Sequence, residues 1–157
     1  MKRMVLAAAM TLALSGVAQA LEVASATETA RFYDLEGKLW AAWNARLRPA
    51  DAAPFYSQSP HNLYFNVTPL KFTGWAEFEK VMTPALAGGA AAKMLIGDDF
   101  RVLREGRTAI VAYTFRTEFS GANAPQSFTG RMTDVWTNER GTWRLVHQHM
   151  SSPLVAP

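Results

Sequence analysis

Four long stretches of strand-like composition fill the second half of the chain, and they restrict the possible folds more than any other feature. They cover residues 92–105, 108–119, 126–137 and 142–150, with a bend expected in the first at 97–99. The segments between them are short, and those at 105–107 and 139–141 each contain a glycine. Connections of hairpin length pair successive strands antiparallel. This half of the chain therefore predicts an antiparallel meander.

The preceding part of the chain has the periodicity of helices. Apolar side chains recur every three or four residues from 27 to 47, at Phe32, Leu35, Leu39, Trp43 and Leu47, which predicts an amphipathic helix. A short helix is expected at 51–56, a strand at 63–67 and a third helix at 74–86. Three N-terminal helices followed by a meander indicate an α+β fold, with the helices packed on one face of a curved, mostly antiparallel sheet.

The opposite face of that sheet also carries apolar residues, and the helices cannot cover both faces. Large apolar faces are usually buried in a contact, and the commonest such contact is with a second copy of the same chain. We therefore expect a homodimer.

The first twenty residues have the pattern of a signal peptide. A basic start, Met1-Lys2-Arg3, precedes an apolar run at 4–17, and Ala18-Gln19-Ala20 has the small-x-small form that signal peptidase accepts. The run is shorter than the roughly 20 apolar residues of a membrane span, and an uncleaved anchor is the alternative. We expect cleavage after Ala20, a single domain over 21–157 that is structured from about 27 to 153, and a periplasmic or secreted protein with no membrane contact after cleavage.

Composition and charge narrow the classes of function. The 157 residues include no cysteine, which excludes a disulfide scaffold. Lysine and arginine number 16 against 13 acidic residues, and two of the 16, Lys2 and Arg3, lie in the signal peptide. The others are dispersed, so no nucleic-acid binding is predicted. Phosphate-loop, dinucleotide and nucleophile-elbow motifs are absent from the sequence, and we expect no cofactor.

The last hairpin carries the polar residues of most interest. A three-residue loop at 139–141, with Gly141 in the left-handed position, is favoured. The pairs of this register share a face: Thr133 with His147, and Arg131 with His149. That face holds Arg131, Thr133, Val135, Trp143, Leu145, His147 and His149, and the opposite face holds Met132, Asp134, Trp136, Arg144, Val146 and Gln148. A two-residue loop, the alternative, brings Asp134 and Met132 beside the histidines instead.

In the favoured register, Arg131, Thr133, His147 and His149 form a polar cluster at one end of an apolar face. A few polar groups in apolar surroundings are typical of a small-molecule cavity, so we expect the cluster to point toward the helices, into a pocket. The other interpretation is that both histidines are hydrogen-bonded structural residues. No metal site is expected, because only His61 remains as a third histidine ligand and Arg131 would repel a cation.

Five segments of the chain are similar to a known family. They are Trp43-Asn44-Ala45-Arg46, Phe65-Asn66-Val67-Thr68-Pro69-Leu70, Thr73-Gly74-Trp75, Gly130-Arg131-Met132-Thr133-Asp134-Val135-Trp136 and the strand from Gly141 to Ser151. They resemble the SnoaL-like family of the nuclear transport factor 2-like superfamily, which includes ketosteroid isomerase. The resemblance implies a cone-shaped, usually dimeric fold with a pocket at its wide end. It also implies that Trp40, Trp43, Tyr64, Asn66 and Trp75 line or border this pocket.

One departure from the family matters for chemistry. Many of these sequences have an aspartate after the phenylalanine of the first strand, where this chain has Asn66, an amide that cannot accept and return a proton. Acid–base chemistry in the pocket would therefore need Asp51 or Asp134 to enter from another direction, or a histidine to act as the base. His147 or His149 is the candidate general base, with Arg131 stabilising an oxyanion.

These observations predict an exported protein that binds a small, partly apolar organic molecule. Arg131, His147 and His149 would contact its carbonyl or carboxylate end. The alternative is a cofactor-free isomerase, cyclase or hydrolase that uses a pocket histidine as general base. A third alternative is a structural dimer whose cavity is filled by its own side chains.

Overall fold

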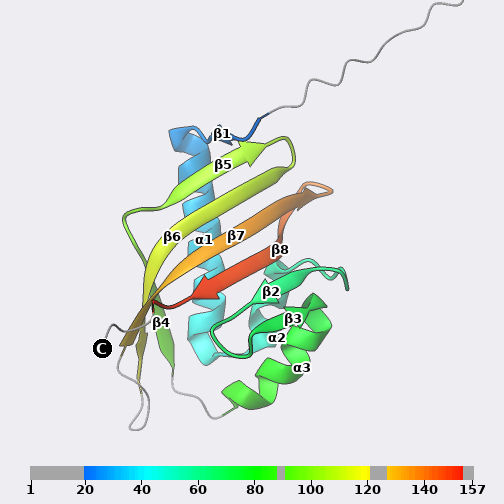
Figure 1. The fold of residues 1–157 in the computed structure, drawn as a ribbon, viewed down its shortest axis with the longest axis vertical. Coiled ribbons are helices and arrows are strands. Elements are labelled where there is room, and N and C mark those ends of the chain that lie inside the picture. The colour runs from blue at the N-terminus through cyan, green and yellow to red at the C-terminus, as the bar shows by residue number, and fades with distance from the viewer. Residues whose placement is uncertain (1–19, 88–90, 121–126, 154–157) are drawn as a thin grey trace, which may run out of the picture.

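The fold is an α+β arrangement in which helices pack on one face of a curved sheet (Figure 1). The computed structural model describes residues 20–87, 91–120 and 127–153. Its elements are β1 (Glu22–Val23), α1 (Ala26–Arg46), α2 (Pro49–Ala52), the 3-10 helix η1 (Ala53–Phe55), β2 (Leu63–Phe65), β3 (Lys71–Thr73), α3 (Gly74–Leu86), β4 (Ala92–Ile96), β5 (Arg101–Glu105), β6 (Thr108–Phe119), β7 (Ser127–Glu139) and β8 (Thr142–Ser151). Regular structure starts at β1, before the position near 27 that the sequence predicts. Among the described helices, none is long and apolar enough to cross a membrane.

Helix α1 is the amphipathic helix that the apolar spacing predicts. Ser25 accepts a hydrogen bond from the backbone N–H of Glu28 at 3.3 Å, and the Glu28 carboxylate accepts one from the backbone N–H of Ser25 at 3.4 Å. This reciprocal pair satisfies two N–H groups at the start of the helix. The buried stripe of α1 consists of Phe32, Glu36, Leu39, Trp40 and Trp43. One of its five members is therefore an ionisable residue.

The sheet has eight strands, in the order β1-β5-β6-β7-β8-β2-β3, and β4 also pairs with β6. The β5–β6–β7–β8 meander is antiparallel, as predicted, and β2 joins β8 in parallel. Strand β3 was not predicted. In Figure 1, α1 runs behind the meander, and α2, α3, β2 and β3 gather at one end of the molecule.

The stretch predicted as one bent strand at 92–105 is two strands, and both pair with β6. Gly97 lies between them and donates its N–H to the carbonyl of Thr114 at 2.7 Å. A Cβ at Gly97 would lie 2.5 Å from Thr114 Oγ1, so the close approach of this segment to β6 requires glycine there. Asp99 then accepts hydrogen bonds from the N–H and hydroxyl of Thr114.

The predicted register of the last hairpin is wrong. Arg140 and Gly141 both have positive φ, at 54° and 94°, and Glu139 pairs with Thr142. This is a two-residue hairpin loop, in which both positions take left-handed backbone. The register then shifts between Val135 and Trp136, and this β-bulge leaves an extra residue in β8. The resulting pairs are Trp136 with Leu145, Val135 with His147, Asp134 with Gln148 and Thr133 with His149.

The bulge decides which side chains face the helices. Side chains alternate between faces along a regular strand, and an extra residue inverts that alternation beyond it. Leu145 is therefore buried on the inner face, whereas His147 and His149 lie on the opposite, outer face. On β7, the inner face carries Met132, Asp134 and Trp136, all buried. The prediction that the histidines share a face with Trp143 and Leu145 is wrong for this reason.

Candidate ligand-binding site

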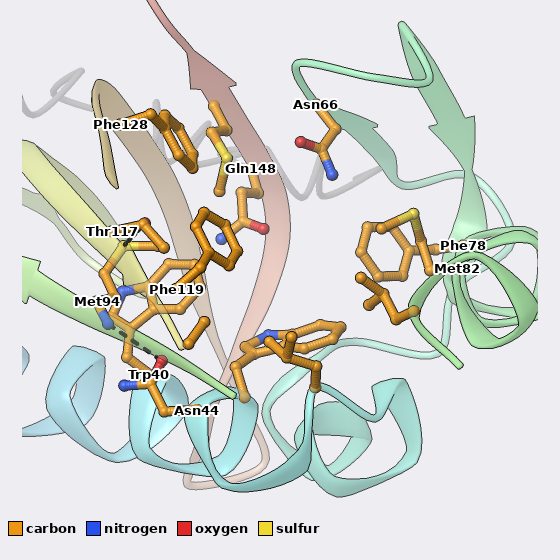
Figure 2. Close-up of a pocket in the computed structure, with 15 residues that line it drawn as sticks. Trp40, Asn44, Asn66, Phe78, Met82, Met94, Thr117, Phe119, Phe128 and Gln148 are labelled. Carbon is orange, nitrogen blue, oxygen red and sulfur yellow. Dashed lines mark hydrogen bonds between the residues drawn. The ribbon is translucent and has the colours of Figure 1, made fainter. Parts of the chain in front are cut away.

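A pocket opens between the end of α1, helix α3 and the inner face of the sheet (Figure 2). Its volume is about 190 Å³. Its lining consists of Trp40, Trp43, Asn44, Leu47, Asn66, Phe78, Met82, Leu86, Ala92, Met94, Thr117, Phe119, Phe128, Gln148 and Met150. Figure 2 shows Phe119, Phe128 and Gln148 on the sheet side, facing Phe78 and Met82 of α3.

None of the described residues that line the pocket carries a charge. Its polar side chains are few, and protein contacts already occupy several of them. The indole N–H of Trp40 donates to Tyr113 at 2.7 Å, and that of Trp43 donates to Tyr56 at 3.3 Å. The amide oxygen of Asn44 accepts from the N–H of Met94 at 3.1 Å. A pocket of this composition suits an uncharged, mainly apolar molecule, because burying an unpaired charge is costly.

Asn66 offers the pocket a hydrogen-bond donor. Its oxygen accepts a hydrogen bond from the N–H of Val67 at 2.7 Å, so the N–H₂ end is the part left to bind other groups. Figure 2 shows this amide directed at the pocket from the end of β2. An oxygen acceptor on a ligand, such as a carbonyl, matches this donor.

The structure distributes the predicted pocket residues over three places. Trp40, Trp43 and Asn66 line the pocket. Tyr64 and Trp75 lie in the core and pack on Tyr56, with ring centroids 5.5 and 4.3 Å from it. The remaining four, Arg131, Thr133, His147 and His149, lie on the outer face of the sheet.

These four outer-face residues do not line the pocket, which corrects the prediction that they point toward the helices. Arg131 and His149 are exposed, and Thr133 and His147 are half-buried. The Nδ1 atom of His147 is 2.8 Å from the carbonyl oxygen of Leu63, and its ring packs against Phe65. His147 therefore joins β8 to β2 as a structural residue. Within the described part of the chain, no group of three potential ligands could hold a metal ion.

Behind the pocket wall lies a pair of buried carboxyl groups that the sequence analysis did not combine. Glu36 of α1 and Asp134 of β7 are both completely buried, and each carboxyl group affects the pKa of the other. Glu36 also accepts from the indole N–H of Trp136 at 2.7 Å and from the hydroxyl of Tyr113 at 3.1 Å. The Asp134 oxygens have no N–H or O–H donor in hydrogen-bond position among the described residues.

Burial raises the pKa of both carboxyls. The pKa of Glu36 rises from 4.5 to about 7, because desolvation outweighs its hydrogen bonds from Trp136 and Tyr113. The pKa of Asp134 rises well above its usual value, first through desolvation and then through the negative charge of Glu36. Asp134, whose oxygens have no hydrogen-bond partner in the described part of the chain, is thus the member that keeps its proton, and Glu36 is the member that titrates near neutrality.

Two side chains connect the acid pair to the pocket. Gln148, which lines the pocket, is the cross-strand neighbour of Asp134 and lies against its carboxyl. Its amide oxygen accepts from the hydroxyl of Tyr56 at 3.1 Å. Trp40, also in the lining, donates to the same Tyr113 hydroxyl that binds Glu36.

A sequence signal for the pair exists in each element. Glu36 lies four residues after Phe32 and four before Trp40, on the apolar stripe of α1, where a charged residue is exceptional. In β7, every second side chain points to the inner face, and Asp134 occupies the inward position between the apolar residues Met132 and Trp136. Asp51, the other candidate acid, is paired with Arg46 and Arg48 at the surface and does not reach the pocket.

An α+β fold whose helices cover a curved sheet and enclose an apolar pocket at one end is a scaffold for small-molecule sites. The family model described as SnoaL-like domain matches residues 38–155. The chain therefore belongs to the SnoaL-like family, as the sequence motifs predict.

Solved structures confirm the fold. A nuclear transport factor 2-like (NTF2-like) superfamily protein from Salmonella enterica aligns with a TM-score of 0.67 and 19% identity, over 84% of this chain and 96% of that one. A candidate dehydratase of the NTF2-like family from Streptomyces avermitilis has a TM-score of 0.70 and 15% identity, over 82% and 98%. A candidate scytalone dehydratase from Novosphingobium aromaticivorans has a TM-score of 0.69 and 9% identity, over 82% and 85%. No curated protein matches the chain. Identities this low establish the fold alone.

Proposed function

We propose that this protein binds an uncharged, mainly apolar molecule of about one ring in the pocket between α1, α3 and the sheet. The observation that carries the proposal is an apolar cavity of about 190 Å³ without a charged residue in its described lining. An engineered apolar cavity of about 150 Å³ binds benzene, so a single ring with a small substituent is the matching size. The predicted contact was between Arg131, His147 and His149 and the carbonyl or carboxylate end of the ligand. The proposal replaces it by a neutral contact with Asn66.

A set of small fluorinated probes tests the size, charge and polarity of the ligand. Fluorine NMR titrations would compare para-fluoroacetophenone, para-fluorotoluene and para-fluorobenzoate. We expect the ketone to bind, the toluene to bind more weakly because it cannot accept a hydrogen bond from Asn66, and the benzoate not to bind. Equal binding of the benzoate would contradict an uncharged ligand.

Two variants locate the binding site. Met82→Trp fills the pocket from α3 and is expected to weaken ketone binding at least about tenfold, the equivalent of about 1.4 kcal/mol. Its neighbour Val81 is 38% exposed, so Val81→Trp is the matched control and should leave the affinity unchanged. If both variants bind the ketone like the parent protein, the probe occupies another site and the proposal fails.

A second candidate function is acid–base catalysis without a cofactor, as an isomerase or a dehydratase. The buried carboxyl pair behind the pocket favours it, because a carboxyl with a pKa near 7 is suited to proton transfer at neutral pH. Two structural neighbours carry dehydratase names, which supports the same class. This candidate replaces the pocket histidine of the sequence prediction by Glu36 and Asp134. The test is the turnover of an enolisable or dehydratable ligand. Glu36→Gln should abolish this turnover while the protein still binds the ligand.

We also propose that the mature protein starts near Leu21 and is exported. Residues 1–19, which carry most of the signal-peptide pattern, lie outside the described residues. Cleavage after Ala20 would leave β1 intact, with its Glu22–Arg104 and Val23–Leu103 pairs. Intact-mass measurement of protein expressed from the full sequence in a Gram-negative host tests this, because an uncleaved product retains twenty more residues.

A further inference from the structure

We propose that Glu36 and Asp134 form a proton-binding site that is linked to the pocket: the pair holds one proton when the pocket is empty, and ligand binding favours uptake of a second. The first half of this inference concerns the ligand-free protein. The second half rests on the proposed binding function.

Complete burial and unequal hydrogen bonding favour one proton on the pair. A buried charge is costly unless hydrogen bonds compensate it. Glu36 already has two donors in Trp136 and Tyr113, at 2.7 and 3.1 Å, whereas Asp134 has no described donor. The stable arrangement is therefore a neutral Asp134 beside an ionised Glu36, and the site carries one negative charge.

No positive charge on the described elements packed around the pair compensates it. The groups that face it are Tyr113 of β6, Trp136 of β7, Gln148 of β8 and, close by, Tyr56 after η1. Burial raises the pKa of both tyrosines well above 10, so they stay protonated. Among the described residues, no lysine, arginine or histidine acts on either carboxyl. Since only Glu36 and Asp134 titrate here near neutral pH, they act together as one coupled site.

The pocket lies next to this site, separated by the side chains of Gln148 and Trp40. Gln148 lies against Asp134, and Trp40 donates to the Tyr113 hydroxyl that binds Glu36. An apolar ligand excludes water from this wall and lowers the local dielectric constant. Desolvation disfavours the charged form of an acid, so ligand binding should drive the pair from one proton toward two. By linkage, the same free energy makes the ligand bind more tightly at lower pH.

The indole N–H of Trp136 reports directly on the first half of the inference, because it donates to Glu36. In ligand-free protein, its nitrogen-15 NMR signal is expected to titrate between pH 5 and 9 with a midpoint near 7. Glu36→Gln should remove this titration, and the exposed Glu105→Gln should not. A Trp136 signal that does not change over this range, or that titrates equally in Glu36→Gln, overturns the proton site. This conclusion does not depend on ligand binding.

The affinity of para-fluoroacetophenone, measured at pH 6 and pH 8.5, tests the link to the pocket. We expect binding to weaken about threefold at the higher pH, which corresponds to a rise of about half a unit in the pKa on binding. Asp134→Asn and Glu36→Gln should each flatten this dependence, so the test does not rely on one variant. If Trp136 titrates but the ketone binds equally at both pH values, the link is wrong. If Trp136 titrates and the ketone binds at no pH, the proton site stands and the proposed binding function fails.

Discussion

Glu36 and Asp134 are 98 positions apart in the sequence, and in the folded protein both carboxyl groups are buried in the core, where each affects the pKa of the other. One comes from the buried stripe of α1 and the other from the inner face of β7. The contact places two ionisable groups directly behind an apolar pocket, where burial keeps at least one of them neutral.

The free energy of unfolding should fall as pH rises through neutrality. The pKa of Glu36 is near 4.5 in the unfolded chain and about 7 in the folded protein, so the folded state binds more protons between these values. Stability is then fully present below about pH 4.5 and is lost progressively up to about pH 7. Asp134 acts in the same direction. The effect of Glu36 is on the order of 3 kcal/mol.

Urea unfolding at pH 5 and pH 8 measures this dependence. Glu36→Gln should reduce the difference between the two pH values, because the amide does not titrate. Glu105→Gln, at an exposed position, is the control and should behave like the parent protein. A parent protein that is more stable at pH 8 than at pH 5 would contradict the raised pKa values.

Tyr113→Phe should destabilise the protein without changing its fold. The hydroxyl of Tyr113 donates to Glu36 and accepts from Trp40, so its removal leaves the indole N–H of Trp40 and one of the two Glu36 oxygens without this partner. Each such group costs about 1–3 kcal/mol, and we expect a loss of about 2–4 kcal/mol in urea unfolding. Tyr33, which is 48% exposed and packs on Phe100, supplies the control Tyr33→Phe, with an expected change below about 0.5 kcal/mol. A loss no larger than in this control would rule out the buried network.

His149→Ala and Arg131→Ala should leave ligand binding unchanged. Both side chains are exposed on the outer face of the sheet, on the side away from the pocket. We expect the affinity for para-fluoroacetophenone to stay within about twofold, which is below 0.5 kcal/mol. Asn66→Leu is the contrasting variant and should reduce binding of the ketone to the level of para-fluorotoluene. A large loss in either outer-face variant would restore the original prediction for these residues.

We propose that the outer face forms a homodimer interface. Its central positions, Leu103, Ile110, Ala112 and Val135, are half-buried in the isolated chain, and the helices cover only the other face. Light scattering after size-exclusion chromatography should give twice the mass of one mature chain. Ile110→Lys should produce monomers, because it places a charge at the centre of the contact. Ala41→Lys, on the exposed side of α1, should not. A monomeric parent protein at micromolar concentration would refute the dimer.

The sequence alone determined the class of fold and most of its elements. The three-and-four spacing from Phe32 to Trp43 predicts α1, and the hairpin-length segments predict the β5–β8 meander. These signals are local, because helix periodicity and turn chemistry depend on neighbouring residues. The family assignment that the sequence motifs suggested was confirmed by the match to the family model. Three of the predicted pocket residues, Trp40, Trp43 and Asn66, also line the pocket.

Only the tertiary structure decided which residues lie together behind the pocket. One additional residue in β8 inverts the alternation of side chains, so His147 and His149 face outward and Gln148 faces inward. A bulge depends on how two strands pair over their whole length, and no single turn residue reveals it. The contact between Glu36 and Asp134 likewise exists only when α1 packs across β7. The low dielectric of that interior then changes the protonation of both carboxyls, which the same residues would not show in an extended chain.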